Sequence, residues 1–258
     1  MQFEGKRAVI TGAGSGIGRA LAIEGSERGI RLALMGRRRE ALDQILSKLT
    51  GTGHFVVTGD ITIAADRLSL MVAVEKEWGG LDILVNNAGV IPFGPLIETT
   101  DDQLQAAIDT NLLGPMALVR EALPLLRREK GRVVNIGSVF GDIPYPLFAA
   151  YSATKAGLRG FSIALRRELA PLGIGVTYAA LRATRTPASD PLQALIEPFD
   201  MKLDEPEAVA KFVWDAVARD ADNVYPKGPE RLFVLLQHLL PHVVDKSIAK
   251  QLSKVGAS

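Results

Sequence analysis

Short apolar runs alternate with longer segments of helical periodicity along most of the chain. The predicted strands are rich in aliphatic and β-branched residues and cover Arg7–Thr11, Arg31–Met35, Phe55–Thr58, Asp82–Asn86, Arg132–Gly137, Gly175–Ala180 and Asn223–Tyr225. The predicted helices lie between them and cover Gly18–Arg28, Arg39–Leu49, Ala64–Trp78, Asp101–Arg128, Tyr151–Leu169 and Glu205–Arg219. A Thr-Asp-Asp-Gln capping box at residues 100–103 predicts the start of the fourth helix.

This alternation of strands and helices predicts the fold class. Several strands are apolar throughout, which is typical of a parallel sheet with helices on both faces. Right-handed crossovers then predict an α/β fold with a doubly wound, mostly parallel sheet of the Rossmann type. No linker or repeat divides the 258 residues, so we expect one domain over 1–258. Ligands of such sheets bind beyond the carboxyl ends of the strands, where the strand order reverses.

A glycine-rich loop, Thr-Gly-Ala-Gly-Ser-Gly-Ile-Gly at residues 11–18, follows the first predicted strand and opens a helix. Glycines permit a tight turn and close approach to a pyrophosphate, whose charge a helix N-terminus favours. A turn without a ligand is the alternative, and the position directly after an N-terminal strand argues against it. The loop therefore predicts cofactor-binding residues at Gly12, Ser15, Gly16, Ile17 and Gly18.

The end of the second predicted strand bears on the identity of the cofactor. An NAD site needs an acidic residue about 20 residues beyond the loop, but Gly36 stands there, followed by Arg37, Arg38 and Arg39. A guanidinium group binds the 2′-phosphate of NADP, which a carboxylate would repel. A solvated basic helix start is the alternative, although the helix dipole opposes cations there. We therefore predict NADP (NADPH) as cofactor, with Arg37 as the main contact and Arg38 in support.

Tyr151 and Lys155 stand four residues apart at the start of a predicted helix, so they share one face of it. A tyrosine has an ordinary pKa of about 10, and lowering it by three units needs about 4 kcal/mol. One positive charge at about 4 Å supplies a comparable energy at an effective dielectric constant of about 20. Lys155 and an oxidised nicotinamide would both contribute positive charge. The pair predicts an acid–base centre, although a Tyr-xxx-Lys pair alone also fits an ordinary helix surface.

These motifs together resemble the short-chain dehydrogenase/reductase family, over roughly residues 5 to 186. The spacing of Gly12, Gly16 and Gly18 is similar to the family's Gly-xxx-Gly-x-Gly loop, and the Tyr-xxx-Lys pair follows in family order. The resemblance implies that Ser138, thirteen residues before Tyr151, holds the substrate oxygen. It implies that Asn111 holds a water in a proton relay to Lys155. It further implies cofactor contacts at Asp60, Ile61, Asn87, Ala88, Gly89, Tyr151, Lys155 and Thr186.

Simpler interpretations stand beside several of these roles. Asp60 also suits a helix cap for the region of Thr62, and Asn86 and Asn87 suit purely structural bonds in the sheet. Ser138 alone is an ordinary strand-end serine. Asn111 alone is a polar residue that bonds backbone and bends a helix.

The function implied by the resemblance is hydride transfer between NADP(H) and a carbonyl or secondary alcohol, with Tyr151 as the proton donor. The alternative is a non-catalytic NADP-binding sensor or scaffold, against which the presence of both Tyr151 and Lys155 argues. Residues 187–203 form an expected substrate lid, and their apolar side chains favour a hydrophobic ketone or 3-oxoacyl substrate. Apolar residues of the loop before Tyr151 point the same way, namely Phe140, Ile143, Tyr145, Leu147 and Phe148. Mutual packing explains these residues equally well.

Two features depart from the family pattern. Leu181 and Arg182 replace a family Pro-Gly, so Arg182 points either to the cofactor and substrate mouth or outward. Residues 229–258 form an expected helical extension with regularly spaced leucines and, farther on, lysines. Its leucines suit packing on the body or a sister subunit, a flap over an apolar substrate, or contact with a membrane surface.

Composition and charge bear on the partners, the cellular location and the metal content that we expect. The net charge of +1 gives no global attraction to nucleic acid, which we do not expect as a partner. The absence of cysteine is compatible with a reducing cytoplasm, where we expect the protein. The three histidines have no metal-ligand spacing, so no metal is expected. We see neither a signal peptide nor an apolar run of about 18 residues. The resemblance implies a homodimer or homotetramer.

Overall fold

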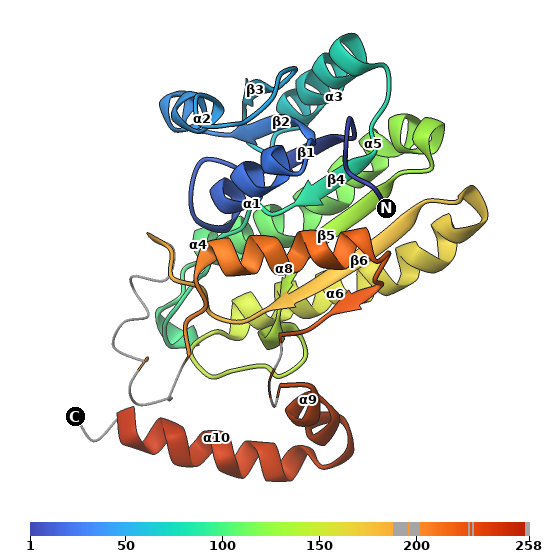
Figure 1. Cartoon of the computed structure of the whole chain (residues 1–258). Coiled ribbons are helices and arrows are strands. Elements are labelled where there is room, and N and C mark those ends of the chain that lie inside the picture. Colours follow the sequence, from blue (N-terminus) through green and yellow to red (C-terminus); the bar gives the residue numbers. More distant parts are fainter. Residues whose placement is uncertain (188–195, 197–201, 227, 229, 256–258) are drawn as a thin grey trace.

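The computed structural model describes residues 1–187, 196, 202–226, 228 and 230–255 (Figure 1). Seven parallel strands form one sheet in the order β3-β2-β1-β4-β5-β6-β7. Their bounds are β1 Arg7–Thr11, β2 Arg31–Gly36, β3 Phe55–Thr58, β4 Ile83–Asn86, β5 Arg132–Ser138, β6 Gly175–Leu181 and β7 Asn223–Val224. The predicted doubly wound sheet is confirmed, and each strand lies within one residue of its predicted bounds.

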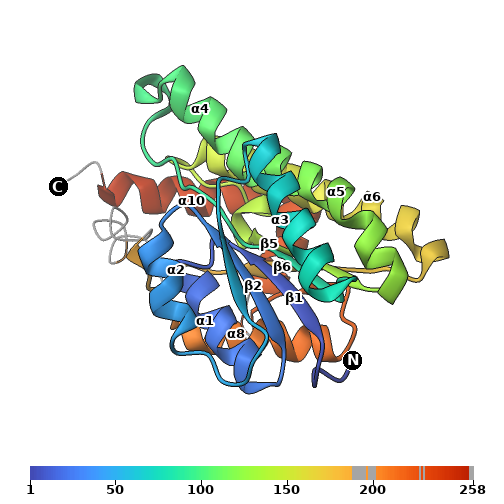
Figure 2. The same cartoon turned by 90° about the horizontal axis from the view of Figure 1, so that it is seen from above.

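Helices cover both faces of the sheet (Figure 2). One face carries α1 (Gly16–Glu27), α2 (Arg39–Leu46) and α8 (Pro206–Ala218), and the other carries α3 (Ala64–Trp78), α5 (Gly114–Glu129) and α6 (Ala149–Leu169). Successive side chains of a strand point to opposite faces. Ala8 and Ile10 of β1 therefore pack toward α1, whereas Val9 packs toward α3 and α5. Both faces being buried explains why these strands are apolar throughout.

The strand order reverses at β1, which pairs with β2 on one side and β4 on the other. The β1–α1 loop leaves the sheet at this reversal, so the fold brings the glycine loop to the expected ligand position. The described chain also contains the short 3-10 helices η1 Leu96–Glu98, η3 Val139–Gly141 and η4 Ala170–Leu172, and the π-helical segment η2 Asp109–Leu113.

The helix predicted over Asp101–Arg128 is interrupted, which is a correction. It consists of α4 (Asp101–Ile108), the π-helical segment η2 and α5. A π turn accommodates one extra residue, and hydrophobic periodicity does not reveal it; such turns are frequent at functional sites. The capping box is confirmed at the start of α4: Thr100 Oγ1 accepts from the Gln103 amide at 3.3 Å, and Gln103 Oε1 accepts from the Thr100 amide at 2.9 Å.

The last two helices lie at the periphery of the molecule, beyond the loop that follows β5 (Figure 1). They are α9 (Glu230–Leu239) and α10 (Pro241–Val255), so the predicted C-terminal extension is helical where it is described. Within the described ranges, no helix has the length and apolar character needed to cross a membrane.

Candidate active site

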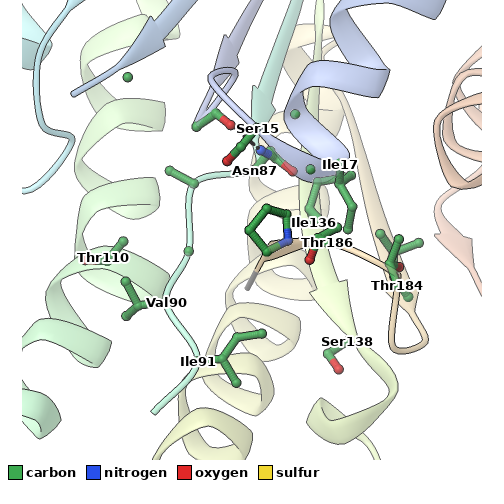
Figure 3. Close-up of a pocket in the computed structure, with 18 of the residues that line it drawn as sticks. Ser15, Ile17, Asn87, Val90, Ile91, Thr110, Ile136, Ser138, Thr184 and Thr186 are labelled. Atoms are coloured by element: carbon green, nitrogen blue, oxygen red, sulfur yellow. Dashed lines mark hydrogen bonds between the residues drawn. The ribbon is translucent and has the colours of Figure 1, made fainter. Parts of the chain in front are cut away.

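A cleft of about 340 Å³ opens at the carboxyl ends of the central strands (Figure 3). All of the predicted cofactor residues line it, namely Gly12, Ser15, Gly16, Ile17, Gly18, Arg37, Arg38, Asp60, Ile61, Asn87, Ala88, Gly89, Tyr151, Lys155 and Thr186. Ser138 also lines the cleft, at the end away from Ser15. Asn111 does not line it, although its neighbour Thr110 does. One cleft thus joins segments from across the sequence.

The glycine loop forms a shallow cradle that side chains would fill. Gly12 has φ +64°, and a Cβ there would lie 2.7 Å from the Cα of Ala88. A Cβ at Gly18 would lie 2.2 Å from the carbonyl oxygen of Gly12. The side chain of Ser15, the residue before α1, makes no capping hydrogen bond. The amide groups of the first helical turn are therefore available to a phosphate, as a dinucleotide site requires.

The end of β4 is bonded to the end of β1 and so supports this cradle. Thr11 Oγ1 accepts from the amides of Asn87 at 3.0 Å and Ala88 at 3.1 Å. The Asn87 side-chain amide donates to the carbonyl oxygens of Thr11 at 2.9 Å and Gly12 at 3.2 Å. Asn86 donates to the side chain of Asn135 on β5 at 2.8 Å. The two asparagines thus have the structural role considered for them, and Asn87 also borders the cleft.

Arg37 and Asp60 lie close together at the glycine-loop end of the cleft. Their side chains approach to 3.8 Å, and the Arg37 side chain is 75% exposed. Asp60 Oδ1 also accepts from the Thr62 amide and hydroxyl, both at 2.9 Å. Asp60 therefore does stabilise the turn at Thr62, while it lines the cleft as well. The exposed guanidinium of Arg37 is placed to meet an anionic group at this edge.

The catalytic candidates lie at the other end. Ser138 ends β5 and Lys155 is buried within α6, while Tyr151 lies one turn before Lys155 and is partly exposed. Lys155 Nζ donates to the carbonyl oxygen of Ile136 at 2.9 Å and lies 5.6 Å from the centre of the Tyr151 ring. The two side chains share one face of the helix, as their spacing predicts.

Burial shifts the pKa values of both side chains away from their charged forms. It raises the pKa of Tyr151 to about 12, although a hydrogen bond with Ser138 opposes the shift. It lowers the pKa of Lys155 to about 8. The direction of the Tyr151 shift is opposite to the expectation that Lys155 lowers the pKa of Tyr151. In the protein without cofactor, desolvation raises the pKa instead, so Tyr151 is protonated and can act as an acid.

Asn111 lies behind the cleft, inside the π-helical segment. Its Oδ1 accepts from the Val90 amide at 2.8 Å, and its Nδ2 donates to the Val90 carbonyl at 2.8 Å and to Thr154 Oγ1 at 3.1 Å. The side chain therefore ties the β4 loop to α6, which agrees with the simpler interpretation of a backbone-bonded polar residue. This bond places Val90 on the wall of the cleft.

Tyr178 of β6 was not predicted as a site residue, yet it supports two of them. It is fully buried, and its hydroxyl lies 3.2 Å from the Ser138 carbonyl oxygen, 3.4 Å from the Ser138 amide and 3.4 Å from the Lys155 carbonyl oxygen. A Cβ at Gly137 would lie 2.2 Å from its ring, and one at Gly141 would lie 2.8 Å from its hydroxyl. These two glycines were the available signal, since they leave room for a large side chain.

Aromatic side chains crowd the Ser138 end of the cleft. Phe140 and Phe148 line it, and their ring centres are 5.0 Å apart. The same cluster includes Ile91, Tyr145, Leu147, Tyr151 and, from α10, Leu252. The apolar residues of this loop therefore do pack on each other, and part of their surface also forms an apolar wall beside Tyr151.

Arg182 lies on the rim and is held by two carboxylates. Its guanidinium bonds Asp204 through two nitrogens at 2.9 and 3.0 Å and Glu230 through the third at 2.6 Å. It borders the cleft rather than turning into solvent, and it ties the end of β6 to the start of α9. Most of the expected lid falls on residues 188–195 and 197–201, outside the described residues; Pro187 lines the cleft. Among the described side chains, no group of three or more His, Asp or Glu gathers as metal ligands.

A doubly wound sheet with a glycine cradle and a Ser, Tyr and Lys group in one cleft is typical of nicotinamide-dependent oxidoreductases. A family model described as short chain dehydrogenase matches residues 6–195, and the chain belongs to this family. Members use nicotinamide dinucleotides with small-molecule substrates, and the protein is an oxidoreductase of the kind that acts on CH–OH groups.

Similar proteins and a solved structure support this family assignment. An uncharacterized oxidoreductase of Staphylococcus aureus (strain MW2) is 33% identical over 215 residues, covering 83% of this chain and 91% of that protein. Another, from Staphylococcus epidermidis (strain ATCC 12228 / FDA PCI 1200), is 34% identical over 186 residues, covering 72% and 80%. The crystal structure of a short-chain dehydrogenase from Streptomyces avermitilis matches with a TM-score of 0.81 at 29% identity, covering 97% of this chain and 98% of that one.

Proposed function

We propose that the protein transfers a hydride between NADP(H) and a carbonyl or secondary alcohol, acting as a reductase of a hydrophobic ketone or 3-oxoacyl compound. The observation that carries this proposal is one continuous cleft with Arg37 at one end and Ser138, Tyr151 and Lys155 at the other. The glycine cradle lines the same cleft. This order suits a dinucleotide lying across the reversal of the sheet.

The residues present fit such a cofactor. The cradle at Gly12–Gly18 and the start of α1 would hold the pyrophosphate. Arg37, with Arg38 in support, would bind a 2′-phosphate, because its guanidinium is exposed at the cleft edge. Asp60 and Ile61 would border the adenine end. Asn87 to Gly89 and Thr186 would border the remainder, since all of them line the cleft.

When bound, the nicotinamide supplies or accepts the hydride. For reduction, Ser138 Oγ and Tyr151 hold the substrate oxygen, and Tyr151 donates its phenolic proton to it. Lys155, fixed by the Ile136 carbonyl, bears a positive charge beside Tyr151 and favours loss of that proton. The proton is resupplied through Lys155 from a water in the region of Asn111, whose side chain is bonded to Val90 and Thr154 and so positions this region without binding the water. Oxidation of an alcohol reverses these transfers.

The substrate class follows from the wall beside Tyr151. Phe140, Phe148 and Ile91 offer apolar surface within reach of the acid, and Leu252 belongs to the same cluster. Burying an apolar group against them contributes roughly 25 cal/mol per Å². We therefore favour a hydrophobic carbonyl substrate over a small polar one. The retained Tyr151 and Lys155 argue against the alternative of a sensor or scaffold.

Fluorescence titration with NADPH and NADH tests the cofactor assignment. We expect tighter binding of NADPH, and we expect Arg37→Ala to weaken NADPH at least ~10-fold while changing NADH little. Arg39→Ala is the matched control, because Arg39 pairs with Asp43 at 2.8 Å and does not line the cleft. Preference for NADH would refute the NADP assignment, and binding of neither would favour the scaffold interpretation.

The proposal also covers the cellular location and the oligomeric state of the protein. We propose a cytoplasmic homodimer or homotetramer, on the strength of the cysteine-free composition and of the family's tendency to oligomerise. Light scattering during gel filtration measures the assembly. A monomer at micromolar concentration would contradict the oligomer, and recovery of the native protein outside the cytoplasm would contradict its location.

A further inference from the structure

Helix α9 carries an apolar surface that the described chain does not cover. Six of its ten residues are Leu, Phe or Val, yet none of the ten is buried. Leu232, Leu235 and Leu239 stand at i, i+3 and i+7, so they form one stripe, and they are 58%, 53% and 67% exposed. Leu240 and Val243, just beyond, are 54% and 53% exposed. A contiguous apolar surface of this kind marks a site of contact.

Cations border this surface. Arg231 precedes Leu235 by one turn of α9, and Lys246 and Lys250 follow Val243 at i+3 and i+7 on α10, so they share its face. All three are exposed. In the described part of the chain, none of the three forms an ion pair. The nearby carboxylate of Glu230 forms an ion pair with Arg182 instead. Asp245, the neighbouring carboxylate on α10, lies 4.0 Å from His242 instead, so the described charges that share a face with these apolar residues are positive.

We propose that this surface docks onto an anionic lipid surface. Its components are the apolar stripe Leu232, Leu235 and Leu239, the adjoining Leu240 and Val243, and the cations Arg231, Lys246 and Lys250. An apolar face bordered by Lys and Arg is the pattern of helices that lie in the membrane interface. A second copy of this chain is a poorer occupant, because a two-fold contact places the same patch against itself and brings like charges together.

The opposite side of α10 packs on the aromatic cluster that forms the apolar wall of the cleft. Leu252 packs in the aromatic cluster with Phe148 and Tyr151, and the Tyr145 hydroxyl donates to Gln251. A protein docked through α9 would thus hold the apolar end of its cleft near the lipid. This last step rests on the proposed function and indicates that the carbonyl substrate partitions into membranes.

Sedimentation of the full chain with vesicles tests the docking. We expect binding to vesicles of phosphatidylcholine with phosphatidylglycerol, at least ~10-fold weaker binding to phosphatidylcholine alone, and weakening by salt. Leu235→Glu combined with Leu239→Glu should reduce binding at least ~10-fold. Lys246→Gln combined with Lys250→Gln should remove the preference for the anionic lipid.

Ile97→Glu is the matched control, since Ile97 on η1 is 94% exposed and belongs to no part of this surface. It should bind vesicles like the parent protein, and melting temperatures should show all variants folded. A parent protein that stays in the supernatant overturns the proposal, and so does equal loss in Ile97→Glu. A smaller assembly for the leucine variant would assign the stripe to a second copy instead. The assay needs neither cofactor nor substrate, so its failure is distinguishable from failure of the proposed reaction.

Discussion

The β1–α1 cradle and helix α9 illustrate two ways of building a surface. In the cradle, an added Cβ at Gly18 would lie 2.2 Å from a backbone oxygen, and Thr11 is fully buried with its hydroxyl donating to Val85 on β4. In α9 no residue is buried, and Arg182 supplies an ion pair that ties it to the sheet. We therefore expect most substitutions in the cradle to disturb the backbone, whereas α9 should accept many substitutions without such a disturbance.

The two regions therefore suit different tasks: the rigid cleft suits the chemical step, and the exposed surface suits the choice of substrate or docking partner. Hydride and proton transfer need groups held within a fraction of an ångström, which a packed sheet edge provides. Choice of substrate and of a docking partner depends on exposed surface, which changes without unfolding the protein. Substitutions near β5 and α6 should therefore have large effects on turnover, and those near α9 small effects on turnover.

Tyr151→Phe should have the largest effect. It removes the proton donor while keeping the ring in the aromatic cluster, so we expect reductase turnover to fall about 10³-fold. NADPH affinity should change less than ~3-fold. Initial rates of NADPH oxidation with an apolar ketone, together with fluorescence titration, measure both. Full activity in this variant would remove Tyr151 from the mechanism.

Lys155→Met should change how stability depends on pH. The ordinary lysine pKa is 10.5, and burial lowers it to about 8 in the folded protein. Between these values the unfolded chain binds a proton that the folded chain lacks, so the free energy of unfolding rises with pH. We expect a rise of about 2 kcal/mol from about pH 7 to about pH 9.5, and its absence in the variant.

Urea unfolding at the two pH values measures this difference. The range stops below about pH 10 because Tyr151, with its raised pKa, acts in the opposite direction above that value. Equal slopes in the two proteins would mean that Lys155 is solvated and carries an ordinary pKa.

Gly18→Ala tests the cradle directly. Its Cβ would lie 2.2 Å from the Gly12 carbonyl and 2.6 Å from Asn87 Nδ2, so the loop must shift. We expect cofactor affinity to fall at least ~10-fold. Gly160→Ala in α6 is the control, because its Cβ meets nothing within 4 Å. It should stabilise the helix by roughly 0.5–1 kcal/mol and leave affinity unchanged.

Most of the fold and the reacting groups could be predicted from the sequence, because both depend on the spacing of residues close together in the chain. Apolar strands, the glycine loop and the Tyr151–Lys155 spacing all leave a signature within a few residues. The π turn at Asn111 leaves none, since it adds one residue without altering polarity. The supporting role of Tyr178 leaves no local signal either, because its hydroxyl contacts residues 40 and 23 positions away. The two carboxylates that bind Arg182 lie 22 and 48 positions farther along the chain, at Asp204 and Glu230.

Tyr178→Phe should have a moderate effect. Phenylalanine fills the same space but removes the hydroxyl that contacts the Ser138 and Lys155 backbone. We expect turnover to fall about 3- to 10-fold and stability to fall by about 1 kcal/mol, with cofactor affinity unchanged. Tyr225→Phe, which loses a 3.1 Å bond to Asp142, should lower stability alone. Equal turnover in both variants would make Tyr178 merely structural.

Arg182→Gln should have the smallest effect on chemistry and the clearest effect on α9. Without the guanidinium, Asp204 and Glu230 face each other unpaired, so the start of α9 should open more often. Hydrogen exchange in α9 should quicken while exchange in β1, β4 and β5 and cofactor affinity change less than ~3-fold. Arg185→Gln, which breaks an exposed 2.9 Å pair with Glu205, should leave α9 unchanged. If exchange rose throughout the sheet instead, the rim would belong to the rigid part of the molecule, and the contrast between the cradle and α9 would not hold.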